Sequence, residues 1–145
     1  MRIRRRVASA VGVLLVAAAL SVGAGNAFAS PTASLKLYLG CVGGDGRNWD
    51  YTLVVQGTTS YYDDHDGARV EYRVWGDDSF SDDFLAGPYF SRSFLGTFYT
   101  GICINKSTLN EDWGQDEIYV GVRVYDPTTG QLIEKVETNR ITGYF

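Results

Sequence analysis

Hydrophobic and polar residues alternate with a period of two through much of the chain after residue 33. The two clearest cases are residues 34–41 and 116–125, where every second side chain is apolar. The apolar positions are Leu35, Leu37, Leu39 and Cys41 in the first segment and Ile118, Val120, Val122 and Val124 in the second. Residues two apart lie on the same face of a β-strand, so each segment predicts a strand with one buried face.

Further strands are predicted by apolar segments that lie between clusters of turn-forming residues. They cover residues 49–56, 68–75 and 131–138, with a short last strand in 140–145. Residues 84–104 hold one or two strands, an edge or crossing strand first and then 92–104. Residues 107–110 favour one helical turn. Residues 126–130, with Asp126, Pro127 and Gly130, favour a hairpin turn.

Seven or eight short strands in one chain indicate an all-β fold, an antiparallel two-layer β-sandwich. The layout resembles immunoglobulin-like sandwiches, although two marks of that family differ here. Trp49 follows Cys41 too closely, and Gly101 stands where the family has a tyrosine before the second cysteine. We expect Cys41 and Cys103 to form one disulfide bond and to link the two layers.

Residues 1–29 have the order of a secretory signal peptide: four arginines, an apolar segment and a small-x-small site at residues 27–29. The style of this leader resembles those of Gram-positive actinobacteria, which implies a bacterial source. We therefore expect a secreted, extracellular protein in which residues 30–145 form a single domain. An uncleaved anchor helix is the alternative interpretation of the apolar segment.

The charge of this expected domain is strongly acidic. The sequence has 13 Lys and Arg, four of them within residues 1–29, so residues 30–145 carry nine against 17 Asp and Glu, a net charge of −8. Such a charge repels nucleic acid phosphates and anionic lipid, so we expect neither as a partner. The expected partners are an extracellular protein or carbohydrate, and the charge favours cations or a basic protein.

Aspartates gather on both sides of the strand predicted at 68–75. We consider Ca²⁺ the one candidate cofactor, because it prefers several oxygen ligands on flexible loops. The candidate ligands are Asp77, Asp78, Asp82 and Asp83 in the loop 76–83, together with Asp45. If neighbouring strands alternate in direction, this loop shares an end of the sandwich with residues 43–50 and with the turn 126–130. Ordinary solvated turns are the alternative interpretation.

Residues 74–85 resemble a calcium-binding loop of C2 domains, where a strand ends in acidic residues and an Asp-Asp-Phe-Leu-Gly segment follows. The resemblance implies Ca²⁺ binding by the same loop. Gly76 stands where that family has its first aspartate, and Ala86 interrupts the Leu-Gly step. A helix–loop–helix calcium loop at residues 62–73 fails because Tyr62 and Arg73 occupy its first and last ligand positions.

Aromatic residues on the outward sides of two strands are the other candidate site. Alternation places Trp75, Tyr119 and Tyr125 outward, beside Arg69, Arg73 and Arg123. If the two strands share a sheet, these side chains form a platform suited to a sugar ring or a protein surface. The alternative is that this face packs under a loop.

Catalysis has little support in the sequence. His65 is the only histidine, and no zinc-ligand spacing, nucleophile elbow or phosphate loop occurs. We therefore expect a secreted, non-catalytic binding module that recognises an extracellular protein or polysaccharide. The alternatives are a calcium-stabilised structural or surface protein that uses loop 76–83, and a small secreted hydrolase.

Overall fold

Eight strands and one helical turn make up the protein, as the computed structural model shows for residues 30–62, 67–78, 81–110 and 114–145. The elements in chain order are β1 (Thr32–Val42), β2 (Asn48–Thr58), β3 (Arg69–Gly76), β4 (Asp83–Arg92), β5 (Thr97–Ile104), α1 (Lys106–Leu109), β6 (Asp116–Tyr125), β7 (Leu132–Glu137) and β8 (Ile141–Gly143). The signal peptide expected at residues 1–29 lies outside the described residues. Within the described part of the chain, no helix is both long enough and apolar enough to cross a membrane.

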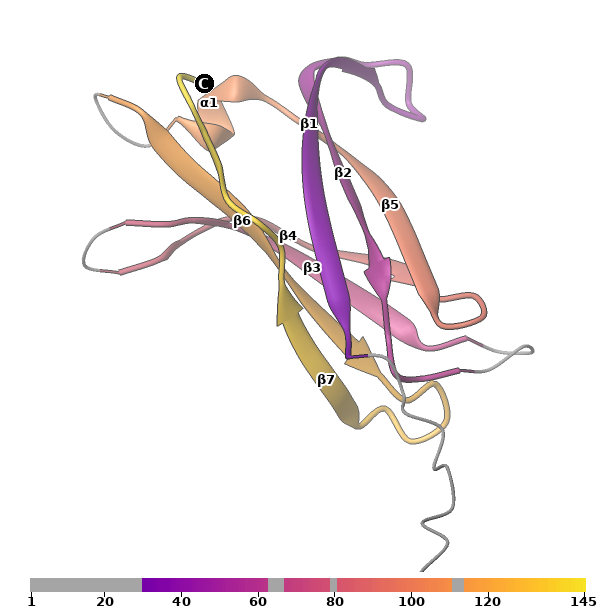
Figure 1. Cartoon of the computed structure of the whole chain (residues 1–145). Helices are drawn as coiled ribbons and strands as arrows, with labels where there is room; N and C mark the ends of the chain where they lie inside the picture. Colours follow the sequence, from indigo (N-terminus) through magenta and orange to yellow (C-terminus); the bar gives the residue numbers. More distant parts are fainter. Residues whose placement is uncertain (1–29, 63–66, 79–80, 111–113) are drawn as a thin grey trace, which may run out of the picture.

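The strands form two antiparallel sheets that pack face to face (Figure 1). One sheet has the order β1-β2-β5, and the other has the order β4-β3-β6-β7, with β8 also pairing with β6. Neighbours in the sheets are often distant in the sequence, as in Greek-key sandwiches. The predicted immunoglobulin-like, two-layer architecture is confirmed, and β4 is an edge strand, where a proline such as Pro88 is tolerated.

The core consists of the inward side chains that the alternation predicts. Val70, Tyr72 and Val74 of β3 are fully buried, as are the alternate apolar residues of β6. They pack against Leu35, Leu53, Val55, Phe98, Ile102 and Ile104 of the other sheet. The Tyr72 and Phe98 rings meet edge to face with centroids 6.1 Å apart, so aromatic contact joins the two layers at the centre.

Two polar contacts hold the layers together at their rim. The Asn139 side chain accepts a hydrogen bond from the Leu35 N–H at 2.9 Å and donates one to the Leu35 carbonyl at 3.2 Å. The Glu134 carboxylate of β7 accepts hydrogen bonds from the Ser60 hydroxyl, at 2.6 Å, and from the Ser60 N–H. Both contacts fix the β7 side of the larger sheet against the smaller sheet.

The expected disulfide Cys41–Cys103 is present, but the expectation that it links the two layers is wrong. It joins β1 to β5, which flank β2 within the three-stranded sheet. Cys103 alternates with the buried Ile102 and Ile104, so it lies on the outer face of that sheet. Gly40 has φ of 76°, and this left-handed residue interrupts the alternation of β1 just before Cys41.

The expectation that turn 126–130 shares an end with loop 76–83 is also wrong. In the antiparallel pair of β3 and β6, Gly76 lies opposite Ile118 and Arg69 lies opposite Tyr125. The turn that follows β6 therefore lies beside the start of β3. The expectation holds only if residues 84–104 form a single strand. They form two, β4 and β5, so the chain reverses once more and β6 runs in the opposite direction to the one expected.

Alkaline pH is expected to destabilise the protein through Tyr72. Burial raises the pKa of this phenol to about 12 from the ordinary 10, and the hydrogen bond with Ser91 partly opposes the shift. The unfolded chain then loses the proton at lower pH than the folded chain, so stability is complete below about pH 10 and falls between about pH 10 and 12. Urea unfolding across this range measures the fall, and Tyr72→Phe is expected to reduce it. An identical pH profile in the variant would contradict this assignment.

Candidate functional site

The outer face of the five-stranded sheet carries the predicted platform residues. Because β3 and β6 are neighbours, Trp75 lies opposite Tyr119 and Glu71 lies opposite Arg123. The condition on which the platform depends, that the two strands share a sheet, is therefore met. We call this surface the basic–aromatic face and define it by Arg69, Glu71, Arg73 and Trp75 of β3, Phe84, Phe90 and Arg92 of β4, Tyr119, Arg123 and Tyr125 of β6, and Lys135 and Glu137 of β7.

Tyr119 is buried, and the expectation of an exposed ring at this position is wrong. Its side chain is only 4% exposed, because the Arg140 guanidinium lies 4.5 Å from the ring centroid. The phenol donates a hydrogen bond to Asp82 Oδ2 at 2.7 Å. Burial and this carboxylate raise the pKa of Tyr119 above its ordinary value. Trp75 and Tyr125 are partly buried, so the open rings of the face lie elsewhere.

The open rings belong to β4, at the edge of the face. Phe84 is 51% exposed and Phe90 is 55% exposed. Phe84 lies edge to face with Trp75, with centroids 5.5 Å apart, and Phe90 lies opposite Glu71. The alternation in the sequence did not single out either residue, because β4 pairs with β3 through register shifts near Tyr72 and Val74.

A single buried carboxylate organises the centre of the face. Glu71 Oε1 accepts a hydrogen bond from Arg73 Nε at 2.6 Å and lies 3.8 Å from Arg123 Nη1. Glu71 Oε2 accepts a hydrogen bond from the Tyr125 hydroxyl at 3.3 Å. These contacts hold the predicted residues Arg73, Arg123 and Tyr125 in fixed positions, since a buried carboxylate requires such partners.

Gly121 leaves a shallow recess in the middle of β6. A Cβ atom added there would meet Trp75 Nε1 at 3.1 Å, so the missing side chain lets the indole lie across the strand. The recess has a volume of about 160 Å³, and the charged residues at its border are Arg73, Arg123, Lys135 and Glu137.

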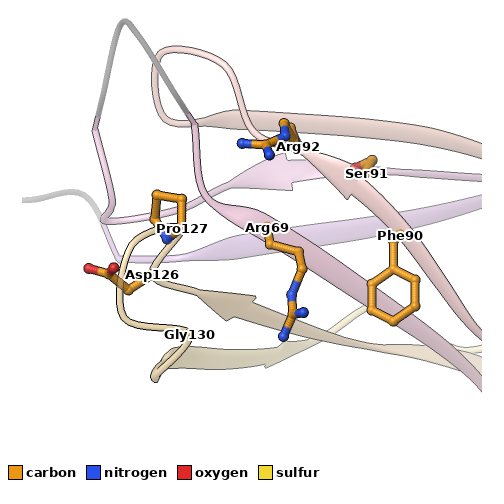
Figure 2. Close-up of a pocket in the computed structure, with 7 residues that line it drawn as sticks. All are labelled: Arg69, Phe90, Ser91, Arg92, Asp126, Pro127 and Gly130. Atoms are coloured by element: carbon orange, nitrogen blue, oxygen red, sulfur yellow. The ribbon is translucent and has the colours of Figure 1, made fainter.

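A larger hollow lies at the other end of the same face, where turn 126–130 approaches β3 and β4. Its volume is about 420 Å³, within the range of about 300–1,000 Å³ that ligand pockets occupy. Figure 2 shows Arg69 projecting between the turn and the Phe90 ring. The hollow is lined by Arg69, Phe90, Ser91, Arg92, Asp126, Pro127 and Gly130.

Arg69 is the central charge of this hollow, and two aromatic rings hold it. Its guanidinium carbon lies 4.6 Å from the centroid of Tyr125 and 5.7 Å from that of Phe90. Cation–π contact orients the guanidinium without neutralising it. Among the described residues, no carboxylate forms an ion pair with Arg69.

Asp126 lines the hollow but is engaged by its own turn. Its Oδ1 accepts hydrogen bonds from the Thr129 N–H at 2.7 Å and the Thr128 N–H at 2.8 Å. These donors hold the pKa of Asp126 below its ordinary value. In Figure 2 its carboxylate is directed away from Arg69. The predicted hairpin turn thus shapes one wall of the hollow, a role that the sequence analysis did not assign to it.

The face is basic although the chain is acidic. Of the nine Lys and Arg in residues 30–145, five lie on it: Arg69, Arg73, Arg92, Arg123 and Lys135. Glu71 and Glu137 are the carboxylates among the residues that define the face, so its five cations outnumber its carboxylates. At physiological salt, charges more than about 8 Å away are largely screened. A ligand on this face therefore meets positive charge, and the net charge of the chain does not describe the surface that it contacts.

No protein-family model, curated protein or solved structure matches this chain. We therefore base the functional proposal on the chemistry of the basic–aromatic face.

Three of the five aspartates predicted to bind Ca²⁺ have partners within the protein. Asp77 forms an ion pair with Arg140, and Asp82 accepts the Tyr119 hydrogen bond. Asp45 forms an ion pair with Arg47 in the turn between β1 and β2, which Figure 1 shows well apart from the β3–β4 loop.

The described residues contain no group of three or more His, Cys, Asp or Glu arranged to hold a metal ion. Asp78 also has an interaction partner. Asp83 is the first residue of β4 and lies opposite Gly76 of β3. Residues 63–66, which include His65, lie outside the described part. Calcium binding by Asp45, Asp77, Asp78, Asp82 and Asp83 stays a prediction.

Proposed function

We propose that residues 30–145 form a secreted, non-catalytic binding module that recognises an extracellular polysaccharide through the basic–aromatic face. The proposal depends on one observation: the exposed rings of Phe84 and Phe90 lie on the same face as guanidinium groups that other side chains hold in place. Aromatic rings pack against the apolar faces of sugar rings, and guanidinium donors bind oxygen atoms around them. The concave hollow at one end of the face fits a small repeating sugar unit better than it fits a broad, flat protein surface.

Secretion is part of the proposal, and it has two supports. Residues 1–29 have the pattern of a signal peptide, and the Cys41–Cys103 disulfide suits an oxidising compartment.

The rings of β4 provide the test of the proposed face. We expect the double variant Phe84→Ala/Phe90→Ala to weaken polysaccharide binding about tenfold or more, because both exposed rings are lost while the core stays intact. A glycan array identifies the ligand, and affinity electrophoresis in gels that contain it measures the change in Kd.

The opposite sheet provides a matched control. Tyr38 and Tyr99 are exposed aromatic residues, 53% and 64% exposed, on the outer face of the three-stranded sheet. The variant Tyr38→Ala/Tyr99→Ala is expected to bind like the wild type. Loss of binding in this control with retention in the β4 variant would place the site on the other sheet and refute the proposal. Capture of a protein alone, with no glycan bound, would refute the choice of polysaccharide.

A further inference from the structure

The hollow beside turn 126–130 has the chemistry of a site for an anionic sugar. We propose that Arg69 binds the carboxylate of a uronate unit in an acidic polysaccharide, with the sugar ring against Phe90 and Pro127. This inference rests on the proposed function and adds the ligand class and the residue that selects it.

The first support is the charge of Arg69, which its neighbours leave unneutralised. The nearest acidic residue on β3, Glu71, is already engaged by Arg73 and Arg123. Asp126, across the hollow, accepts two hydrogen bonds from its own turn. An incoming carboxylate would therefore meet a guanidinium whose charge is available to it.

The second support is preorganisation of the donor. The rings of Phe90 and Tyr125 flank the Arg69 guanidinium, so little side-chain freedom is lost when a ligand binds. A guanidinium presents its N–H groups as a planar fork that matches a carboxylate in two parallel hydrogen bonds. Arg69 is thus suited to a planar anion more than to a neutral hydroxyl.

The third support is the apolar lining beside the charge. Phe90 and Pro127 lie on either side of Arg69 in Figure 2 and offer flat, apolar surfaces. A uronate has a ring for such surfaces and a carboxylate attached directly to that ring. An acidic peptide carries its carboxylates on flexible stems, which have no ring to occupy the hollow.

The rest of the face favours a polymer over a single sugar. From the hollow, Arg123 and Lys135 continue the row of cations across β6 and β7, where they lie opposite each other. A chain with an acidic unit at intervals would place further carboxylates along this row. The border of the Gly121 recess supplies the next cations after Arg69, where Arg73, Arg123 and Lys135 outnumber the one carboxylate, Glu137.

The test uses the purified protein and three probes: polygalacturonate, its fully methyl-esterified form and poly-L-glutamate. We expect the wild type to bind polygalacturonate and to bind the other two at least about tenfold more weakly, because one lacks charge and the other lacks the sugar ring. Arg69→Gln is expected to weaken polygalacturonate binding about tenfold or more, and Arg69→Lys to weaken it less, since lysine keeps the charge but not the fork.

The control is Lys36→Gln, which removes an exposed cation from the outer face of the opposite sheet and is expected to bind like the wild type. Three results would overturn the inference: no binding of polygalacturonate, unchanged binding by Arg69→Gln, or poly-L-glutamate binding as tightly as polygalacturonate. Binding of a neutral glycan that depends on Phe84 and Phe90, with none to polygalacturonate, would refute this inference and leave the proposed function standing. Thermal midpoints confirm that each variant is folded.

Discussion

Tyr72→Ala is expected to lower the free energy of unfolding by about 3–5 kcal/mol, as other truncations of large buried aromatic residues do. Tyr72 is fully buried in the centre of β3, and its ring contacts Phe98 of the opposite sheet. The substitution removes the ring and leaves a cavity at the point where the two layers meet. Since domains of this kind have total stabilities of about 5–15 kcal/mol, the loss is a large part of the whole.

Urea unfolding followed by circular dichroism measures this effect. The control is Tyr72→Phe, which keeps the ring and removes only the hydroxyl that lies 2.7 Å from Ser91 Oγ. We expect this variant to lose about 1 kcal/mol, because one hydrogen bond is lost and the packing remains. A Tyr72→Ala variant within about 1 kcal/mol of the wild type would show that the two sheets do not depend on this contact.

Removal of the disulfide by Cys41→Ser/Cys103→Ser is expected to cost about 4 kcal/mol. The bond closes a loop with a sequence separation of 62 residues, and in the chain-entropy model its loss gives the unfolded chain much more freedom. The loop contains β2, β3 and β4, so the constraint spans strands of both sheets. Because the bond lies on an outer face, its removal leaves the aromatic core unchanged.

Guanidinium unfolding of the double variant, with and without dithiothreitol, checks this expectation. Reductant should lower the unfolding midpoint of the wild type towards that of the variant and leave the variant unaffected. An identical midpoint for the oxidised wild type and the variant would mean that the bond contributes nothing to stability. Polysaccharide binding is expected to survive the double substitution, since both cysteines lie on the sheet opposite the basic–aromatic face.

Local alternation predicted the strands well where it was regular. The segment 116–125 matches β6, because its apolar side chains alternate without interruption and polar residues border it. Alternation did not show where along β1 the other sheet stops covering the apolar side chains. Leu39 continues the pattern of Leu35 and Leu37, yet it is 86% exposed.

Long-range arrangement was harder to predict because it depends on how strands pair across the chain. Period-two alternation says which residues share a face of one strand, but not which strand lies beside it. The direction of β6 was misassigned for this reason, and so was the layer joined by Cys103. The sequence did contain one signal for the position of the disulfide. Gly40 directly precedes Cys41, and glycine readily adopts the left-handed conformation that it has there.

The candidate site was predicted in part. Trp75, Tyr125, Arg73 and Arg123 were expected on the outward face of one sheet and lie there. Tyr119 lies there too, but Arg140 covers it, and Arg140 is distant in the sequence. Phe84, Phe90 and Arg92 were missed because the register shifts between β3 and β4 decide their position. Pattern reasoning found the strands that form the face but not its edge.

The paired hydrogen bonds of Asn139 have a consequence for how copies of this protein meet. β1 is an outermost strand, and such strands offer free backbone groups to which a strand of another molecule can add. At Leu35 the amide of Asn139 already occupies both the N–H and the carbonyl. A second copy would have to displace this side chain to extend the sheet at β1, so Asn139 protects this edge against strand addition.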